Sequence, residues 1–170
     1  MAGLALANVD GNLSDGRGLL DRSLKINPHN ASAWIASCFV HAHSGNPAAA
    51  LKDFGSAQDV NPDDSSQHLQ WHAAATALFI AGRYEEADEA SDKALAQMPS
   101  YPGSLRMKVA TSALLGRTAD AQNSARRLLQ VNPNASLANM RLYWQPWIGH
   151  TPEAIAALLN GWRRTAMPEG

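Results

Sequence analysis

The histidines are the residues whose spacing comes nearest to a chemical motif. His68 and His72 are four positions apart, so on a helix both imidazoles would lie on one face and could bind one metal ion. A zinc site needs three or four protein ligands, and no further His, Cys or carboxylate follows at a matching spacing. His41 and His43 are two positions apart and would point in nearly opposite directions on a helix. We therefore expect no metal and no cofactor, and keep a His-based metal-dependent enzyme only as an alternative.

The other nucleophilic and acidic residues fit structural positions. Cys38 occupies a repeat position that elsewhere holds small or apolar residues, where a thiol is buried and unreactive. Glu85, Glu86 and Asp88 fall at the start of a predicted helix, where carboxylates complement the helix dipole and face solvent. No glycine-rich phosphate loop or nucleophile elbow is present. The sequence predicts that the protein is not an enzyme.

Composition excludes several other classes of protein. The chain of 170 residues has 14 Lys and Arg against 15 Asp and Glu, and these charges are scattered, which argues against nucleic-acid binding. Its longest apolar runs, such as 73–81, are far shorter than the roughly 20 residues that a membrane helix needs, so no membrane insertion is expected. No basic residue precedes Arg17, so the start lacks the charge of a secretory signal and a cytoplasmic location is predicted.

Two markers repeat along the chain with one period and define the elements that must position these residues. The intervals are 34, 37 and 34 residues, both for the prolines at 28, 62, 99 and 133 and for the glycines at 11, 45, 82 and 116. Apolar residues between the markers recur at helical spacing, so each period is two helices, the first ended by Gly and the second by Pro. Helices this short are unstable alone and must stack on their neighbours. The predicted fold is therefore all-α, an α-solenoid of helix-turn-helix repeats.

The markers divide a single domain, 1–170, into successive units. A truncated repeat (1–28), whose first helix already contains Met1, is followed by repeats at 29–62, at 63–99 with a three-residue insertion, and at 100–133. A degenerate repeat, 134–170, holds a helix at 135–144 and a capping helix from Thr151 to about Arg164. The apolar face of this last helix is expected to pack on the helix at 118–130. Lys108 departs from the pattern, because the equivalent positions are Ser37 and Ala74.

The period and its residues resemble the tetratricopeptide repeat (TPR) family. The resemblance is carried by Trp71, the run 82–87, Ala94-Leu95 and Pro99 in one unit, and by Ala50, Phe54, Ala57 and Pro62 in the unit before it. It implies about four TPR-like repeats and a capping pair that bind a protein or peptide.

A narrower resemblance covers Asn27 to Pro168. This stretch is similar to the C-terminal TPR region of bacterial class III adenylate/guanylate cyclases and of related winged-helix regulators, through the segments 41–47, 81–87, 114–117 and 161–169. It implies a regulatory or scaffolding part of a larger signalling protein, with Met1 inside a longer polypeptide. A free-standing TPR adaptor is the alternative.

The first helix of each pair should line the concave side of such a stack. The side chains predicted to form a partner-binding groove there are Ile35, Phe39, His43, His72, Thr76, Phe79 and Arg106. This groove is apolar and suits a peptide or helix segment, which could come from another protein or from an upstream domain of the same polypeptide, with Arg106 holding an acidic group. Only Arg106 fits a clamp for two carboxylates, so a receptor for chaperone tails is not favoured. Two alternatives remain: the C-terminal segment carrying Trp144 and Trp147 fills part of the face, or the chain forms homo-oligomers.

Overall fold

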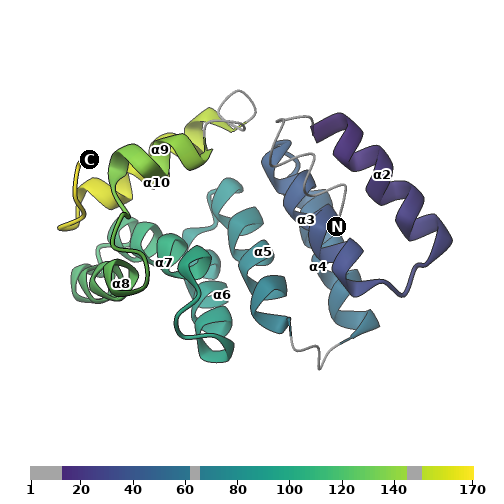
Figure 1. The fold of residues 1–170 in the computed structure, drawn as a ribbon, viewed down its shortest axis with the longest axis horizontal. Helices are drawn as coiled ribbons and strands as arrows, with labels where there is room; N and C mark the ends of the chain where they lie inside the picture. Colours follow the sequence, from purple (N-terminus) through teal and green to yellow (C-terminus); the bar gives the residue numbers. More distant parts are fainter. Residues whose placement is uncertain (1–12, 62–65, 145–150) are drawn as a thin grey trace.

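The protein is described by a computed structural model that covers residues 13–61, 66–144 and 151–170. These residues form nine helices, labelled as in Figure 1: α2 (Leu13–Ile26), α3 (Ala31–His43), α4 (Pro47–Val60), α5 (Gln67–Ile80), α6 (Tyr84–Gln97), α7 (Pro102–Leu114), α8 (Thr118–Val131), α9 (Leu137–Trp144) and α10 (Pro152–Arg163). The predicted all-α array of helix pairs is confirmed. The predicted first helix of the truncated repeat, most of the three-residue insertion and Trp147 lie outside the described residues.

Glycine makes the turn inside each described pair. Gly45, Gly82 and Gly116 have φ of 75°, 74° and 75°, a left-handed conformation that costs glycine little. In each turn, the glycine N–H and the next N–H donate to carbonyls in the last turn of the preceding helix, as when Asn46 N donates to His41 O at 2.9 Å. The glycine marker of the sequence is therefore a helix C-cap.

Asparagine and proline fix where several helices begin. The side chain of Asn30 accepts a hydrogen bond from Ala33 N at 3.1 Å, and that of Asn46 accepts one from Ala49 N at 3.2 Å. Proline takes the first position of α4, α7 and α10, where its missing N–H costs nothing. The asparagine caps and first-position prolines fix where these helices begin in each unit of the repeat.

The pairs stack in chain order (Figure 1). α3 packs on α4, α5 on α6 and α7 on α8, while α3, α5 and α7 also contact one another in sequence and form an inner layer. Ala50, Ala87 and Ala121 are almost fully buried where the helices of a pair cross, because only a small side chain permits so close an approach. The inner layer carries the face that the sequence predicts to be the groove.

The last helix packs on a different neighbour from the predicted one. α10 lies on α7 rather than on the 118–130 helix, α8. The fit depends on Gly161, where an added Cβ would be 2.7 Å from the carbonyl oxygen of Ala110, and on Trp162, whose Nε1 donates to Arg106 O at 3.1 Å. A glycine lets the two backbones touch, so α10 covers the inner face of α7.

The segment after α10 holds α9 in place. Leu137 N donates to Pro168 O at 2.9 Å, and Ala138 N donates to Glu169 O at 3.0 Å, so carbonyls of the tail cap the start of α9. Met167 is buried beside them. α9 and α10 lie against each other (Figure 1), and together they return across the inner layer.

Candidate functional site

The inner layer and the C-terminal helices enclose a pocket of about 240 Å³. Five helices supply its walls: α3, α5 and α7 from the array, and α9 and α10 from the C-terminal pair. Most lining side chains are apolar or aromatic. The residues are Ser32, Ile35, Ala36, Phe39, His43, Ser66, Leu69, His72, Thr76, Tyr101, Gly103, Arg106, Met107, Tyr143, Trp144 and Leu158.

The aromatic rings of this pocket contact one another around the cavity. The ring of Phe39 is 5.5 Å from that of His72 and stacks on His43 at 6.4 Å. Trp144 packs edge-on against His43 at 5.0 Å, and Tyr101 does the same against His72 at 5.2 Å. The packed rings support one another and form a wall made by α3, α5, the residue before α7, and α9.

The two buried histidines of the pocket are neutral. Burial, and then the charge of His72, lower the pKa of His43 to about 3. Burial, and then the charges of Arg106 and His68, lower the pKa of His72 to about 3. Within the described residues, Nδ1 of His72 is buried without a hydrogen-bond partner. At neutral pH these imidazoles supply ring faces rather than charge.

Arg106 brings the single formal charge among the described residues that line the pocket. The guanidinium lies over the ring of Tyr143, 4.9 Å from its centre, in a cation–π contact. The side chain is partly buried and makes no hydrogen bond or ion pair with the described part of the chain. Its positive charge is therefore uncompensated there, and it lowers the pKa of His72.

Six of the seven residues predicted for the groove line this pocket: Ile35, Phe39, His43, His72, Thr76 and Arg106. Phe79 does not, because it is 2% exposed in the core, where its ring packs 5.2 Å from that of Tyr84. Phe79 lies three residues before its turn glycine, as the fully buried Ala42 does, whereas His43 lies two residues before Gly45. The position three before the glycine faces the partner helix, and the prediction for Phe79 was wrong.

The pocket residues that the groove prediction missed come mainly from α9, α10 and the start of α7. Tyr101 precedes α7, Tyr143 and Trp144 end α9, and Leu158 is on α10. The alternative in which the C-terminal segment fills part of the concave face named Trp144, and the structure places Trp144 in this wall. Repeat spacing alone could not assign Tyr143, Trp144 or Leu158, because the period has decayed after Pro133.

The predicted pair His68 and His72 does approach a common neighbour, but that neighbour is Tyr101. Both imidazoles pack edge-on against its ring at 5.2 Å. Among the residues that the structure describes, no group of three His, Cys, Asp or Glu side chains could hold a metal ion. This pair belongs to the aromatic wall.

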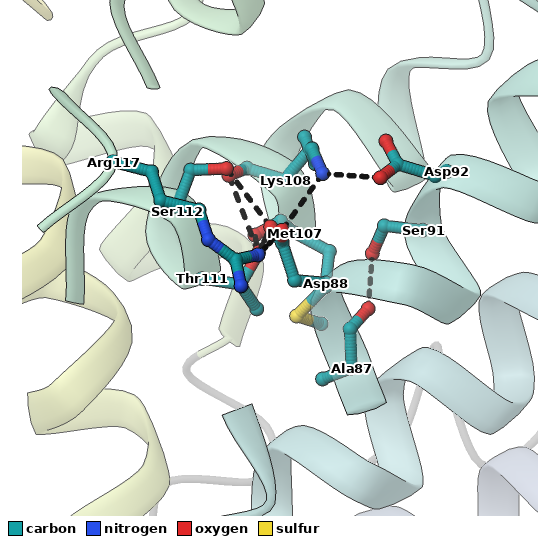
Figure 2. A network of polar contacts seen from close by, with 9 residues as sticks. All are labelled: Ala87, Asp88, Ser91, Asp92, Met107, Lys108, Thr111, Ser112 and Arg117. Carbon is teal, nitrogen blue, oxygen red and sulfur yellow. Dashed lines mark hydrogen bonds and ion pairs between the residues drawn. The ribbon is translucent and has the colours of Figure 1, made fainter. Parts of the chain in front are cut away.

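A buried ion network joins α6, α7 and the turn after α7 (Figure 2). Asp88 is 1% exposed and accepts hydrogen bonds from Thr111 at 2.6 Å, from Ser112 at 2.8 Å and from Lys108 at 2.8 Å, with Arg117 as a fourth donor. Burial alone would raise the pKa of Asp88, but the hydrogen bonds and the charge of Lys108 outweigh it and lower the pKa. The expectation that Asp88 faces solvent was wrong. Glu86 does face solvent, where it pairs with Arg83.

The network also accounts for Lys108, the departure from the repeat. Its ammonium bridges Asp88 at 2.8 Å and Asp92 at 2.6 Å, both on α6 (Figure 2). The equivalent position in the α3–α4 pair, Ser37, donates to Asp53 at 2.6 Å, and His41 contacts the same carboxylate at 2.7 Å. In both units a polar residue on the inner helix is buried against an acid of an outer helix.

These polar groups are arranged for structure rather than for nucleophilic chemistry. Ser37 and His41 both bond the Asp53 carboxylate, so the hydroxyl is not aligned with the imidazole as a nucleophile would be. Cys38 is fully buried, and burial, followed by the charge of Asp53, raises the pKa of its thiol. Its predicted core position is confirmed.

Solved structures share this fold at low sequence identity. Two crystal structures of MamA are 13% and 14% identical to the chain, with TM-scores of 0.64 and 0.63. The matches cover 93% and 96% of this chain, and 89% and 88% of the respective MamA chains. A chain in the structure of Naa15/Naa10 bound to HypK-THB is 16% identical with a TM-score of 0.62, and the match covers 98% of this chain but 25% of that one. No protein-family profile and no curated protein sequence matches the chain. The fold is thus a TPR-like array of helix pairs. No helix in the described ranges is long and apolar enough to cross a membrane.

Proposed function

We propose that the protein is a non-enzymatic interaction module that binds a peptide or helix segment of a partner on its concave side. The observation that carries this proposal is the pocket itself: an apolar, aromatic hollow on the inner layer, with Arg106 unpaired among the described residues. Apolar anchors in such a hollow supply most of the binding energy of an interface, and Arg106 would hold an acidic group of the segment. The TPR-like fold supports a scaffold role.

The state of the titratable groups supports a binding role over catalysis. A general base must be positioned with a pKa near the working pH, whereas the pKa values of His43 and His72 are about 3. The carboxylate of Asp88 is saturated by donors from its own chain. Neither site offers a group that is ready to transfer a proton at neutral pH.

The narrower sequence resemblance supports a more specific hypothesis, in which the chain is the regulatory C-terminal part of a cyclase-like bacterial signalling protein. Its partner would then be an upstream domain of the same polypeptide. The reading frame upstream of Met1 in the native gene tests this hypothesis. A cyclase or winged-helix domain encoded in frame would support it, and a stop codon directly upstream would favour the free-standing adaptor.

The concave-side proposal is tested by selection from a library of displayed peptides on the purified chain, followed by fluorescence polarisation with the enriched peptides. We expect dissociation constants on the order of micromolar, about 8 kcal/mol, as suits a segment that loses entropy on binding. Phe39→Ala should weaken binding at least tenfold. Phe54→Ala is the matched control, since Phe54 lies on α4 in the outer layer against Trp71.

Two results would contradict this proposal. Failure to enrich any peptide would argue against a segment-binding module. Equal weakening by Phe39→Ala and Phe54→Ala, with helicity unchanged, would place the binding surface elsewhere on the array.

A further inference from the structure

We propose that the concave pocket is also a binding site for a small organic monoanion, a carboxylic acid with a flat or branched apolar body. This inference goes beyond the proposed function, because it requires no protein partner. It rests on three features of the pocket: its one uncompensated charge, the character of its walls and its closure by the C-terminal helices.

The charge of the pocket selects an anion. Arg106 is partly buried, and no Asp or Glu is among the described residues that line the pocket. Its guanidinium has the Tyr143 ring on one side and no carboxylate on the described chain to bond. A planar carboxylate can pair with the free N–H groups of a guanidinium in a fork, and a partly buried site strengthens that pair. Although rings attract cations, Arg106 would repel one here.

The walls select an apolar body. Phe39, Trp144, Leu158 and Met107 line the cavity, and the neutral imidazoles of His43 and His72 present their rings beside them. A second ionised group on the ligand would meet this wall without a counter-charge, and burying an unpaired charge there is strongly unfavourable. The pocket therefore favours one charge per ligand.

The closure of the pocket selects a compact molecule. An array of helix pairs alone would leave a groove that is open along its length, but Tyr143 and Trp144 of α9 and Leu158 of α10 add a wall. Tyr143 is 51% exposed, whereas Trp144 and Leu158 are buried. The carboxylate therefore lies on Arg106 near the exposed edge at Tyr143, and the apolar body lies inward against Trp144 and Leu158.

The test is isothermal titration calorimetry of the full chain with 2-naphthoate and with 2-naphthamide, its neutral counterpart of the same shape. We expect 2-naphthoate to bind and 2-naphthamide to bind roughly 10- to 100-fold more weakly, the range of a charged hydrogen-bonded pair. Arg106→Gln should reduce the affinity for 2-naphthoate by the same factor and leave that for 2-naphthamide unchanged. Arg163→Gln, which removes an exposed arginine of α10, is the matched control and should change neither.

A second variant tests the location without touching the core. Ser32 is exposed on α3 at the edge of the pocket, so Ser32→Trp should cover the entrance and abolish binding of 2-naphthoate while the helicity stays unchanged. Unchanged affinity in Ser32→Trp, or equal affinity for the acid and the amide, would overturn the proposal.

A last arm separates a small acid from the end of a peptide. Gly-Gly-Gly-Trp with a free carboxylate is titrated beside its C-terminal amide. If this peptide acid binds and 2-naphthoate does not, the small-molecule assignment is overturned in favour of a peptide end. These titrations are independent of the peptide selection, so either proposal can fail alone.

Discussion

Replacement of Asp88 by Asn tests the buried ion network most directly. The substitution keeps the shape of the side chain but removes the charge that four donors share (Figure 2). Lys108, whose side chain is 9% exposed, would retain one partner, Asp92, which is itself 61% exposed. The new amide would also turn a donor toward one of the present donors.

The magnitude follows from which groups can reach water. Breaking a buried pair by removing one partner costs about 3–5 kcal/mol. Here the side chain of Arg117 is 44% exposed and can turn to solvent, and Lys108 keeps Asp92, so we expect a loss of about 3 kcal/mol at the low end of that range. This is a large part of the 5–15 kcal/mol that stabilises an ordinary domain.

Urea unfolding followed by circular dichroism at pH 7 measures this loss. Glu86→Gln is the matched control: it removes an exposed carboxylate of the same helix and should leave the midpoint unchanged. The double change Asp88→Leu with Lys108→Met should recover most of the loss, because it removes both buried charges. A loss below about 1 kcal/mol in Asp88→Asn would refute the reasoning and mean that water solvates Lys108.

Acid unfolding gives the same network a second signature. The pKa of Asp88 is lowered on folding, so its contribution to stability is present above the ordinary value of 3.8 and is lost as the pH falls through the folded value. Asp88→Asn should therefore flatten the stability profile in strong acid. A profile that is unchanged by the substitution would contradict the lowered pKa.

Three other predictions concern the α10 contact, the pocket histidines and the outer layer. Gly161→Ala should destabilise the chain, because an added Cβ would meet the α7 backbone. Gly18→Ala should stabilise it by about 0.5–1 kcal/mol, because an added Cβ there meets open space. If the two variants shifted the melting temperature in the same direction, the contact between α10 and α7 would be contradicted. Because the pKa of both His43 and His72 is lowered to about 3, the unfolded chain binds more protons than the folded chain below pH 6.5. The free energy of unfolding from urea titrations should therefore fall between pH 7 and pH 5, by up to about 1.4 kcal/mol per pH unit for each histidine. A free energy that does not change over this range would show that both imidazoles are solvated. Trp71→Ala should cost about 2–4 kcal/mol in urea titration because the indole is half-buried under Lys93, and a cost below about 1 kcal/mol would mean that it packs loosely.

The repeat spacing was enough to predict the elements and much of the inner face. A glycine at the same place in each unit, between two stretches of helical apolar spacing, predicts a left-handed residue that ends the first helix. Gly45, Gly82 and Gly116 all have that conformation. Counting back from these glycines located Ile35 and Phe39 on the inner layer. The spacing of residues on a helix depends only on near neighbours in the sequence, so a sequence pattern predicts it well.

The count failed by a single position at Phe79. One residue on a helix turns the side chain by about 100°, which moves it from the concave face to the contact with the partner helix. Ala42 holds the equivalent position and is fully buried, so comparison of the two units shows the correct register. The large side chain of Phe79 fills the core instead of the groove.

Long-range partners limited the rest of the prediction. Asp88 was assigned to solvent because its own helix start explains a carboxylate, whereas its donors Lys108 and Arg117 lie on the next helix and in the turn after it, 20 and 29 residues along the chain. Lys108 was the available signal, since a lysine at a small-residue position requires a buried acid. The seat of α10 on α7 depends in the same way on Gly161 meeting Ala110, a contact between residues far apart in the sequence.

The capping of α9 by later residues also sets an order of assembly on the ribosome. Domains fold from the N-terminal side as the chain is made, so α3, α5 and α7 can stack while the carbonyls of Pro168 and Glu169 have not yet been synthesised. Until then the amides of Leu137 and Ala138 lack these acceptors, and the start of α9, a helix of eight residues, keeps only the cap in which Asn139 N donates to the Ser136 hydroxyl at 3.1 Å. We therefore expect the nascent chain to leave the apolar inner face of α3, α5 and α7 exposed until α9, α10 and the tail dock and complete the walls of the pocket.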